Sequence, residues 1–430
     1  MARAQGEEPD VVAVPEPALT PQELVARARA LIPRLREEQD AAEERGHYSE
    51  ELHREFQRAG FYRICQPRRF GGYEFSLTTF LRTMVAVSSG DPGSGWCLTL
   101  GASHALVVAS FFGEQAQAEA FGPDGDFRAP HPVAPLGEAE RVDGGWRVSG
   151  RAAYASGIPY ATWALCNALV GGSGGGAEPP ETIVMLVPRR DLEMLDDWGG
   201  RSGRMLGMNA SGSNSFILRG AFVPDRFAQR FDWFVGPPRT TQGYELHGNP
   251  MYLLRLGGPY HSSLVTPIVG AARAALDEFR TLIETKPTLF PPIVPRYTFH
   301  EDQRVYGLAT AMTDAAETIL YGFGEQYMEA TARAAAGEPA MNAVQDARWW
   351  TMLQQAGGLA ASAVEMLAHR STSSATARGS RLGRYLRDVT MYRQHISAQQ
   401  DDFAVRSAAL YLGVSDSLMA GGGVRTPPAL

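Results

Sequence analysis

The chain is poor in cysteine and has few histidines. Its 430 residues include three cysteines, Cys65, Cys97 and Cys166, which lie far apart and form no CxxC pair. Such isolated cysteines are typical of reduced, mostly buried thiols, so we expect a cytoplasmic protein without a disulfide framework. The nine histidines are scattered and form no HxxxH or HExxH pattern. The sequence therefore predicts no metal site.

The chain also lacks long apolar runs and an excess of positive charge. No apolar run looks long enough to span a bilayer, and the first residues form no charged and then apolar leader, so we expect neither a membrane span nor a secretory signal. Residues 1–19 are acidic and contain proline, which is typical of a flexible arm. The net charge of -7 argues against nucleic acids and anionic membranes as general partners.

Several common nucleotide-binding and hydrolytic motifs are missing. The glycine-rich stretch GGSGGGAEPP at 171–180 leads into an expected strand and not into a helix, so a surface hairpin loop is favoured over a phosphate loop. No βαβ unit is present, which argues against a Rossmann domain and a nicotinamide site. The stretch GASHA at 101–105 does not match GxSxG, so no hydrolase elbow is indicated.

The N-terminal part of the chain has the pattern of a series of helices. Thr20 and Glu23 form a capping box, with Pro21 in the first turn, and predict a helix that runs to about Gly46. Further helices are expected at 49–60, at 76–90 and at 93–112. The last of these is apolar almost all round, so we expect it to be a central buried helix.

Short strands follow, and then long helices. Alternation around Asp143-Gly144-Gly145 predicts a hairpin. Helical patterns at 262–284, 300–337, 341–370 and 381–413 predict a four-helix bundle. We therefore expect a mostly α, α+β fold: a flexible arm, a helical domain, a small β barrel or sandwich, and a bundle, with the boundaries 1–19, 20–125, 126–240 and 241–430.

One expected helix carries an unusual face. Arg384, Asp388, Met391 and His395 lie at helical spacing and share one side of a helix that should pack against its neighbours. A packed face is normally apolar. Arg384 and Asp388 could form an i,i+4 ion pair and His395 could be a satisfied core histidine, or the face could line a site.

Four stretches together carry a resemblance to a known family. They are GSGWCLTLGASH (93–104), GRAAYASGIPYATWAL (150–165), WGGRSGRMLGMNASGSNSFILRGAFVP (198–224) and GSRLGRYLRDVTMYRQH (379–395). With the order of helices, strands and bundle, they resemble the acyl-CoA dehydrogenase superfamily, and more narrowly its flavin-dependent monooxygenases. The stretch FRAPHPVAPLG (127–137), with Ala129-Pro130-His131-Pro132, departs from the Ser-rich strand usual there.

The resemblance implies an oxygenase component of a two-component system. Such proteins take reduced FMN or FAD from a separate NAD(P)H-dependent flavin reductase and form a flavin C4a-hydroperoxide with oxygen. The expected reaction is hydroxylation of an aromatic, phenolic or polyketide-like small molecule, or oxidation of an amine. The resemblance also implies a homotetramer, with flavin sites completed between subunits.

The resemblance also suggests roles for particular residues. His395 would take a proton from the substrate, because histidine ordinarily titrates near neutral pH, and Asp388 with Arg384 would brace its helix. Ser156 would lie beside the flavin ring, although Ser-Gly is also a common turn. His104 and Trp96 would lie near flavin and substrate. The remaining flavin contacts would be Tyr154, Ala155 and Gly157 at the ring, and Ser373, Ser374, Arg378 and Arg381 at the phosphate tail, where a solvated loop is the alternative.

A second function in the same superfamily stays open, namely an acyl-CoA dehydrogenase or oxidase. That chemistry needs a carboxylate base over the substrate. The tail, 410–430, contains no Glu, which counts against it, but Glu317 and Glu325 on a bundle helix keep the possibility open. A third alternative is a flavoprotein scaffold that has lost its chemistry.

Overall fold

A computed structural model describes residues 12–170, 181–200, 205–230, 240–253, 255–339, 341–377, 379–415 and 418. Its first part is helical, as predicted, and the capping box is confirmed: the Thr20 hydroxyl accepts the Glu23 N–H, and the Glu23 carboxylate accepts the Thr20 N–H. The helices of this part are α1 (Pro21–Ala30), α2 (Ile32–Arg45), α3 (Glu50–Ala59), α4 (Leu77–Ser88), α5 (Pro92–Ser103), α6 (Ala105–Phe111) and α7 (Glu114–Phe121).

The helix expected from Thr20 to about Gly46 is broken in the structure. It divides at Leu31 into α1 and α2. The cause is Pro33, because a proline has no N–H to donate and its ring clashes with the carbonyl four residues earlier. Pro33 thus ends α1 and lies in the first turn of α2.

The expected central helix at 93–112 also divides, at His104. This histidine closes α5 and opens α6, and its ring Nδ1 lies 2.7 Å from the carbonyl oxygen of Ala129. Among the described residues, Pro92–Phe111 is the one stretch whose length and composition would allow a membrane span, and 89% of its window is buried in the fold. It is therefore a core element, as the sequence predicted.

The middle of the chain forms one seven-stranded sheet, in the order β5-β6-β2-β1-β3-β4-β7. Val142 pairs with Gly145 across the two-residue turn Asp143-Gly144, which confirms the predicted hairpin. Gly144 has a φ of 71°, a backbone conformation that glycine adopts without steric cost. The stretch 171–180 lies outside the described residues. The strands are β1 (Gly137–Val142), β2 (Gly145–Ala152), β3 (Trp163–Val170), β4 (Glu181–Pro188), β5 (Glu193–Met194), β6 (Phe216–Pro224) and β7 (Ala228–Gln229).

The third part is the predicted bundle. After the short α8 (Gln242–His247), its long helices are α9 (Gly257–Thr285), α10 (His300–Ala335), α11 (Ala343–Arg370) and α12 (Arg381–Tyr392). The helix expected at 381–413 is wrong in its extent: α12 ends at Tyr392, a short 3-10 helix, η9 (Ile396–Ala398), follows, and α13 (Gln400–Tyr411) packs on α11. His395 lies in extended backbone and caps η9, so it shares no helix with Arg384.

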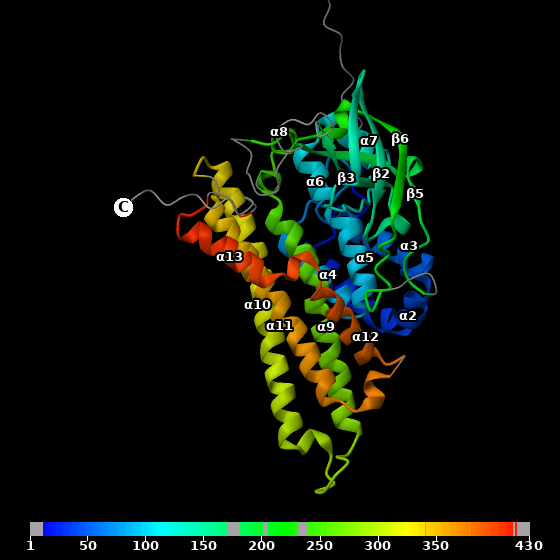
Figure 1. Ribbon diagram of the computed structural model, residues 1–430, viewed down its shortest axis with the longest axis vertical. Coiled ribbons are helices and arrows are strands. Elements are labelled where there is room, and N and C mark those ends of the chain that lie inside the picture. Colours follow the sequence, from blue (N-terminus) through cyan, green and yellow to red (C-terminus); the bar gives the residue numbers. More distant parts are fainter. Residues whose placement is uncertain are drawn as a thin grey trace, which may run out of the picture.

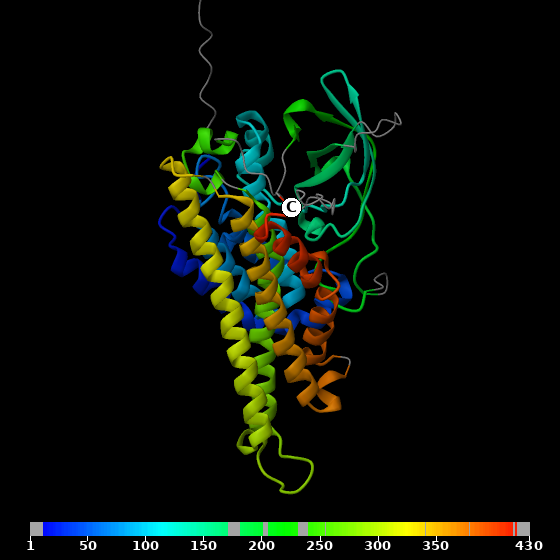
Figure 2. The same ribbon diagram turned by 60° about the vertical axis from the view of Figure 1, so that its left-hand side comes forward.

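Figures 1 and 2 show how the three parts meet. The sheet lies beside the upper half of the bundle, and α5 runs between the sheet and α9. Helix α9 packs against α4, α5, α10, α11 and α12. The loop that enters β6 and the residues between α12 and α13 both contact α5, through Gly212 beside Cys97 and His395 beside Trp96, although they are far apart in the sequence.

Candidate active site

A chain of hydrogen bonds joins α5 to two loops of the β part. The indole N–H of Trp96 donates to the Ser156 hydroxyl at 3.0 Å. The hydroxyl oxygens of Ser156 and Ser213 are 2.7 Å apart, and those of Ser213 and Ser211 are 2.6 Å apart. All four residues are buried. The structure thus brings Trp96 and Ser156, which were selected separately from the sequence, into direct contact, together with two serines of the loop before β6.

Local backbone geometry brings Ser156 to this place. It follows β2 in a tight loop in which Tyr154 has a φ of 59° and Gly157 a φ of 89°. A Cβ on Gly157 would lie 2.8 Å from the carbonyl oxygen of Cys97, so only glycine allows the loop to rest on α5. The Ser156 N–H already donates to the Tyr154 carbonyl at 3.0 Å. Its hydroxyl is therefore the group that can meet a ligand.

His395 lies on the other side of Trp96. The two rings meet edge to face, with centroids 5.6 Å apart. The His395 Nδ1 accepts the backbone N–H of Ser397 at 3.1 Å and lies 2.8 Å from the Ser397 hydroxyl. Burial lowers the pKa of His395 to about 4, so the ring is neutral at pH 7. His395 was expected to titrate near neutral pH, and in the structure its pKa lies below that range because burial disfavours the charged ring.

The predicted Arg384–Asp388 pair is also wrong. Arg384 pairs with Asp40 and, at 2.9 Å, with Glu43, both on α2. Asp388 instead accepts the Met208 N–H at 2.5 Å, so it holds the loop that carries the serines. Burial raises the pKa of Asp388 to about 7; the Met208 N–H opposes this shift and the buried carboxyl of Asp91 adds to it.

His104 lies at the far end of α5, in a different environment. It is 2% exposed, and its Nδ1 is bonded to the Ala129 carbonyl, while its Nε2 is buried without a hydrogen-bond partner among the described residues. Burial lowers the pKa of His104 to about 4. The neighbouring His131, from the stretch that departs from the family pattern, has its ring centroid 5.5 Å away and bonds Asn167 at 3.0 Å.

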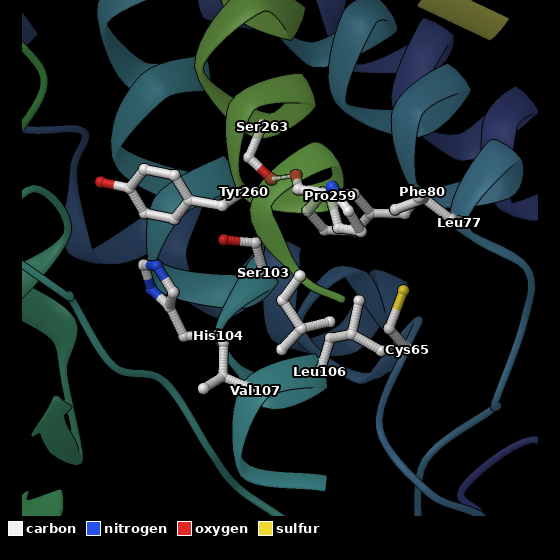
Figure 3. Close-up of a pocket in the computed structure, with 11 residues that line it drawn as sticks. Cys65, Leu77, Phe80, Ser103, His104, Leu106, Val107, Pro259, Tyr260 and Ser263 are labelled. Carbon is white, nitrogen blue, oxygen red and sulfur yellow. Dashed lines mark hydrogen bonds between the residues drawn. The ribbon is translucent and has the colours of Figure 1, made fainter. Parts of the chain in front are cut away.

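A small cavity of about 20 Å³ opens beside His104, and this is room for one water-sized molecule. The Ser103 hydroxyl oxygen is likewise buried without a partner among the described residues. Figure 3 shows His104 and Tyr260 on one side of the cavity and Cys65 and Phe80 on the other. The other lining residues are Leu77, Leu106, Val107, Leu256, Pro259 and Ser263.

The residues predicted for a phosphate tail lie apart from these clusters. Ser373 and Ser374 are exposed on η8 (Ser373–Thr376), with the Ser374 hydroxyl 2.8 Å from that of Thr372. Arg381 contacts Glu278 at 3.2 Å. Arg378 lies outside the described residues.

The two candidate bases of a dehydrogenase are held elsewhere. Glu317 forms an ion pair with Arg273 and accepts the Tyr321 hydroxyl at 2.6 Å. Glu325 is 66% exposed and lies 3.6 Å from Arg82. Neither carboxylate has a contact with Trp96, Ser156 or His104 among the described residues, so the structure gives the dehydrogenase alternative no support.

The Ser156 region suits the flat ring system of a flavin. Tyr154 is 60% exposed beside it, while Ala155 and Gly157 add little bulk. Trp96 donates to Ser156, and either hydroxyl can be the donor in the bond between Ser156 and Ser213; when Ser213 donates, Ser156 keeps its own proton for a ligand. Among the described residues, no group of three or more His, Cys, Asp or Glu side chains is placed to hold a metal ion.

Several residues of the site were not identified from the sequence. Ser211 and Ser213 stand in a Ser-Gly-Ser turn whose only signal was its small residues. Ser397 carried no signal. His261 of α9 is fully buried, and burial, followed by the nearby His395, lowers its pKa to about 3.

Two family models match the chain. The N-terminal domain of acyl-CoA dehydrogenases matches residues 21–124, and the C-terminal domain matches residues 262–400. Both matches lie in the helical parts, on either side of the sheet.

Characterised relatives are similar over much of the chain. A pigment production hydroxylase from Rhodococcus sp. (strain ATCC 21145) is 31% identical over 72% of this chain and 76% of its own length. The oxygenase subunit HsaA of a flavin-dependent monooxygenase from Rhodococcus jostii (strain RHA1) is 30% identical over 58% of this chain, and the match spans 63% of that relative.

Solved structures show the same fold. The 3-HSA hydroxylase from Rhodococcus sp. RHA1 superimposes with a TM-score of 0.80 over 92% of this chain and 99% of that one, at 26% identity. XiaF from Streptomyces sp., whose structure contains FADH2, gives a TM-score of 0.80 at 21% identity, over 92% of this chain and 96% of its own.

Proposed function

Because this chain belongs to the acyl-CoA dehydrogenase superfamily, in its branch of flavin-dependent monooxygenases, we propose that it is an oxygenase component that hydroxylates a small phenol. Reduced FMN or FAD would come from a separate NAD(P)H-dependent reductase. When bound, the reduced flavin supplies the electrons that activate O2, one atom of which enters the substrate while the other leaves as water.

The observation that carries this proposal is the cluster at Trp96. Groups from α5, the loop after β2, the loop before β6 and the turn after α12 meet there, with Ser156 as the hydroxyl that can donate. Neutral hydroxyl groups on loops that pack against α5 suit a flavin ring, because they can bond its polar edge without adding a charge to the site. Trp96, Tyr154, Ala155, Ser156 and Gly157 would hold the ring.

The cavity at His104 supports a phenolic substrate. Its walls are apolar, and its two unpartnered polar atoms, the His104 Nε2 and the Ser103 Oγ, can orient a hydroxyl group. A ring is larger than the cavity, so lining side chains must shift when it binds, as is common at binding sites. Oxidation of an amine would use the same two atoms and stays the alternative.

We also propose an oligomeric state for the protein, the limits of its domains and its location in the cell. A homotetramer with flavin sites completed between subunits is supported by the exposed Ser373 and Ser374, which could meet a phosphate held by a neighbouring copy. Domain limits near residues 125 and 240 are supported by the change from helices to strands and back. A cytoplasmic location is supported by the three buried, free cysteines.

A single-turnover experiment tests the function. The protein is mixed with photoreduced FMN or FAD, isotopically labelled O2 and a panel of phenols that includes resorcinol and 4-hydroxyphenylacetate. We expect one labelled oxygen atom in the product, without any acyl-CoA. Flavin reduction by an acyl-CoA, with no labelled product, would establish the dehydrogenase instead.

A further inference from the structure

The loop before β6 that carries the buried serines, residues 207–213 and here called the serine loop, begins on α12. Gly207 lies against the backbone of that helix, since an added Cβ would lie 2.4 Å from the carbonyl carbon and oxygen of Arg387 and 2.7 Å from the nitrogen of Asp388. The next residue, Met208, donates its N–H to the Asp388 carboxyl group at 2.5 Å. Two consecutive residues of the serine loop are therefore docked on one turn of α12.

Met208 is held at both of its backbone polar atoms. Its N–H is bound to Asp388, and its carbonyl oxygen accepts the indole N–H of Trp198 at 3.1 Å and the backbone N–H of Ser211 at 3.0 Å. Met208 has a φ of 55°, and a residue with a side chain adopts this left-handed conformation only at a steric cost. The bonds from other segments therefore hold Met208 in a conformation that a free loop would seldom adopt.

Helix α2 also holds the serine loop. The Gly212 N–H donates to the carbonyl of Gly46, the C-cap of α2, at 2.8 Å, and the Asn209 amide donates to Glu43 at 3.2 Å. The Glu43 carboxylate also accepts a bond from Arg384 of α12 at 2.9 Å. Glu43 thus joins the serine loop, α2 and α12.

The position of the serine loop determines where its hydroxyl groups lie. The Ser213 hydroxyl oxygen is 2.7 Å from that of Ser156, and the Gly157 N–H donates to the Gly212 carbonyl at 3.1 Å. A shift of the loop by roughly 1 Å would break such bonds. Among the described residues, the hydroxyl group of Ser156 bonds Trp96 and Ser213, so α12 can act on Ser156 through the serine loop.

We infer that Asp388 and Gly207 are positioning residues of the flavin site: they dock the serine loop on α12 and thereby place the hydroxyl groups against which reduced flavin binds. This inference rests on the proposed function and extends its flavin site to a helix of the bundle. The Asp388 carboxyl group suits this role because it is 3% exposed, so water does not compete for the Met208 N–H.

The first test needs no flavin. Hydrogen exchange of the full-length protein, followed by mass spectrometry, measures the protection of the peptide that contains residues 207–213. We expect Asp388→Ala and Gly207→Ala to raise the exchange rate of this peptide about tenfold, because one removes the acceptor of the Met208 N–H and the other pushes the loop away from α12. Asp388→Asn keeps an acceptor oxygen and should stay within about threefold of the wild type. Unchanged protection in both alanine variants would overturn the inference, whether or not the protein is an oxygenase.

Two substitutions are matched controls. Val389 is fully buried beside Asp388 in the sequence of α12, and Val389→Ala removes packing without removing a side-chain hydrogen bond. A Cβ added to Gly322 of α10 would meet open space, so Gly322→Ala makes the same chemical change as Gly207→Ala without a clash. Both controls should leave the exchange of the serine loop within about threefold of the wild type. Equal exposure of the loop in Val389→Ala would mean that any damage to α12 releases it, and would end the specific role of Asp388.

Anaerobic titration with reduced FMN and reduced FAD tests the link to the flavin site. We expect Asp388→Ala and Gly207→Ala to bind reduced flavin roughly tenfold more weakly, the scale of one lost hydrogen bond, and Asp388→Asn and both controls to stay within about threefold of the wild type. Thermal melting checks that every variant folds, and rescue by asparagine separates positioning from a general loss of stability. Normal affinity in variants whose serine loop has lost protection would overturn the role in flavin binding. A wild type without affinity for either flavin would end the proposed function and this role with it, while the exchange rates would still decide whether Asp388 and Gly207 dock the loop.

Discussion

The two ends of α5 differ in how their polar groups are satisfied. At the Trp96 end, Ser156, Ser213 and Ser211 bond one another in sequence. At the His104 end, the described residues leave His104 Nε2 and Ser103 Oγ buried without a partner. A satisfied cluster is stable without a ligand, whereas an unsatisfied buried atom costs about 1–3 kcal/mol until something bonds it. The comparison suggests that the serine cluster is preorganised and that His104 and Ser103 gain a hydrogen bond when a ligand binds.

The largest expected effect is on the rate of turnover, and we expect it to differ between the two ends of α5. We predict that His104→Asn lowers the rate of hydroxylation by about 10²–10⁴-fold, the usual scale for a group that handles the proton of a reacting oxygen. His395→Asn should cost less, because the Nδ1 of His395 is engaged by the Ser397 N–H and the ring does not line the cavity at His104. Rapid-mixing measurement of labelled product gives both rates. A larger loss in His395→Asn would place the proton acceptor at the Trp96 end.

The second prediction enlarges the cavity at the His104 end. Leu106 is 4% exposed and lines this cavity, so Leu106→Ala should lower the free energy of unfolding by about 2–5 kcal/mol. The enlarged cavity should then bind 4-nitrophenol more tightly than the wild type does. Urea unfolding with and without the dye measures both changes. If Leu106→Ala is destabilised but gains no affinity, the cavity is not the phenol site.

The third prediction concerns Asp388, whose carboxyl group holds the loop that carries Ser211 and Ser213. The pKa of Asp388 is raised from 3.8 to about 7, so the folded protein binds more protons than the unfolded chain between these values. The stability that depends on this group therefore falls as the pH rises through that window, by at most about 1.4 kcal/mol per pH unit. In Asp388→Asn, whose amide oxygen can still accept the Met208 N–H, this slope should disappear.

Urea titrations at several pH values measure the slope in both proteins. Arg384, Glu43 and Asp91 also influence the Asp388 carboxyl. Asp91→Asn is therefore the control, since it removes the neighbouring charge and should lower the Asp388 pKa while keeping part of the slope. Equal slopes in the wild type and Asp388→Asn would mean that Asp388 is ionised throughout.

The fourth prediction concerns the loss of the hydrogen bonds made by the Ser156 hydroxyl. Ser156→Ala removes the acceptor of the Trp96 N–H and the donor available to a ligand, so reduced flavin should bind roughly tenfold more weakly, for a loss of about 1–1.5 kcal/mol. Anaerobic titration measures the affinity, and the indole fluorescence of the flavin-free protein reports the broken bond. The conservative Ser156→Thr should restore most of the affinity. Unchanged affinity in Ser156→Ala would remove Ser156 from the flavin site.

The fold could be predicted from the sequence wherever local signals determine it. The Thr20 capping box and the Asp143-Gly144 turn carry their own geometry, and both are confirmed. The breaks at His104 and after Tyr392 could not be predicted, because no glycine or proline marks them. They depend on tertiary contacts, such as the bond from His104 to Ala129, 25 residues away.

The same limit applies to the site. Residue type and family spacing were enough to select Trp96, Ser156, His104 and His395. They did not reveal the partners of Arg384, because Glu43 is 341 residues away and replaces the nearby Asp388. The hydrogen-bond partner of His104 was equally hidden, since Ala129 lies in another segment of the chain.

The smallest expected effect comes from a substitution outside α5, and it tests whether the catalytic residues lie on or beside that helix. Glu317 is one of the two candidate bases for a dehydrogenase, but this partly exposed carboxylate is bound to Arg273 and to the Tyr321 hydroxyl. Glu317→Gln should therefore leave hydroxylation within about twofold of the wild type and lower stability by about 0–1 kcal/mol, the usual worth of a partly exposed ion pair. Product yield and thermal melting measure the two quantities. The glutamine keeps an oxygen that can accept from Tyr321, so a large loss of activity in a normally folded Glu317→Gln could come only from the missing carboxylate. Such a loss would show that the catalytic group lies in the bundle and not on α5.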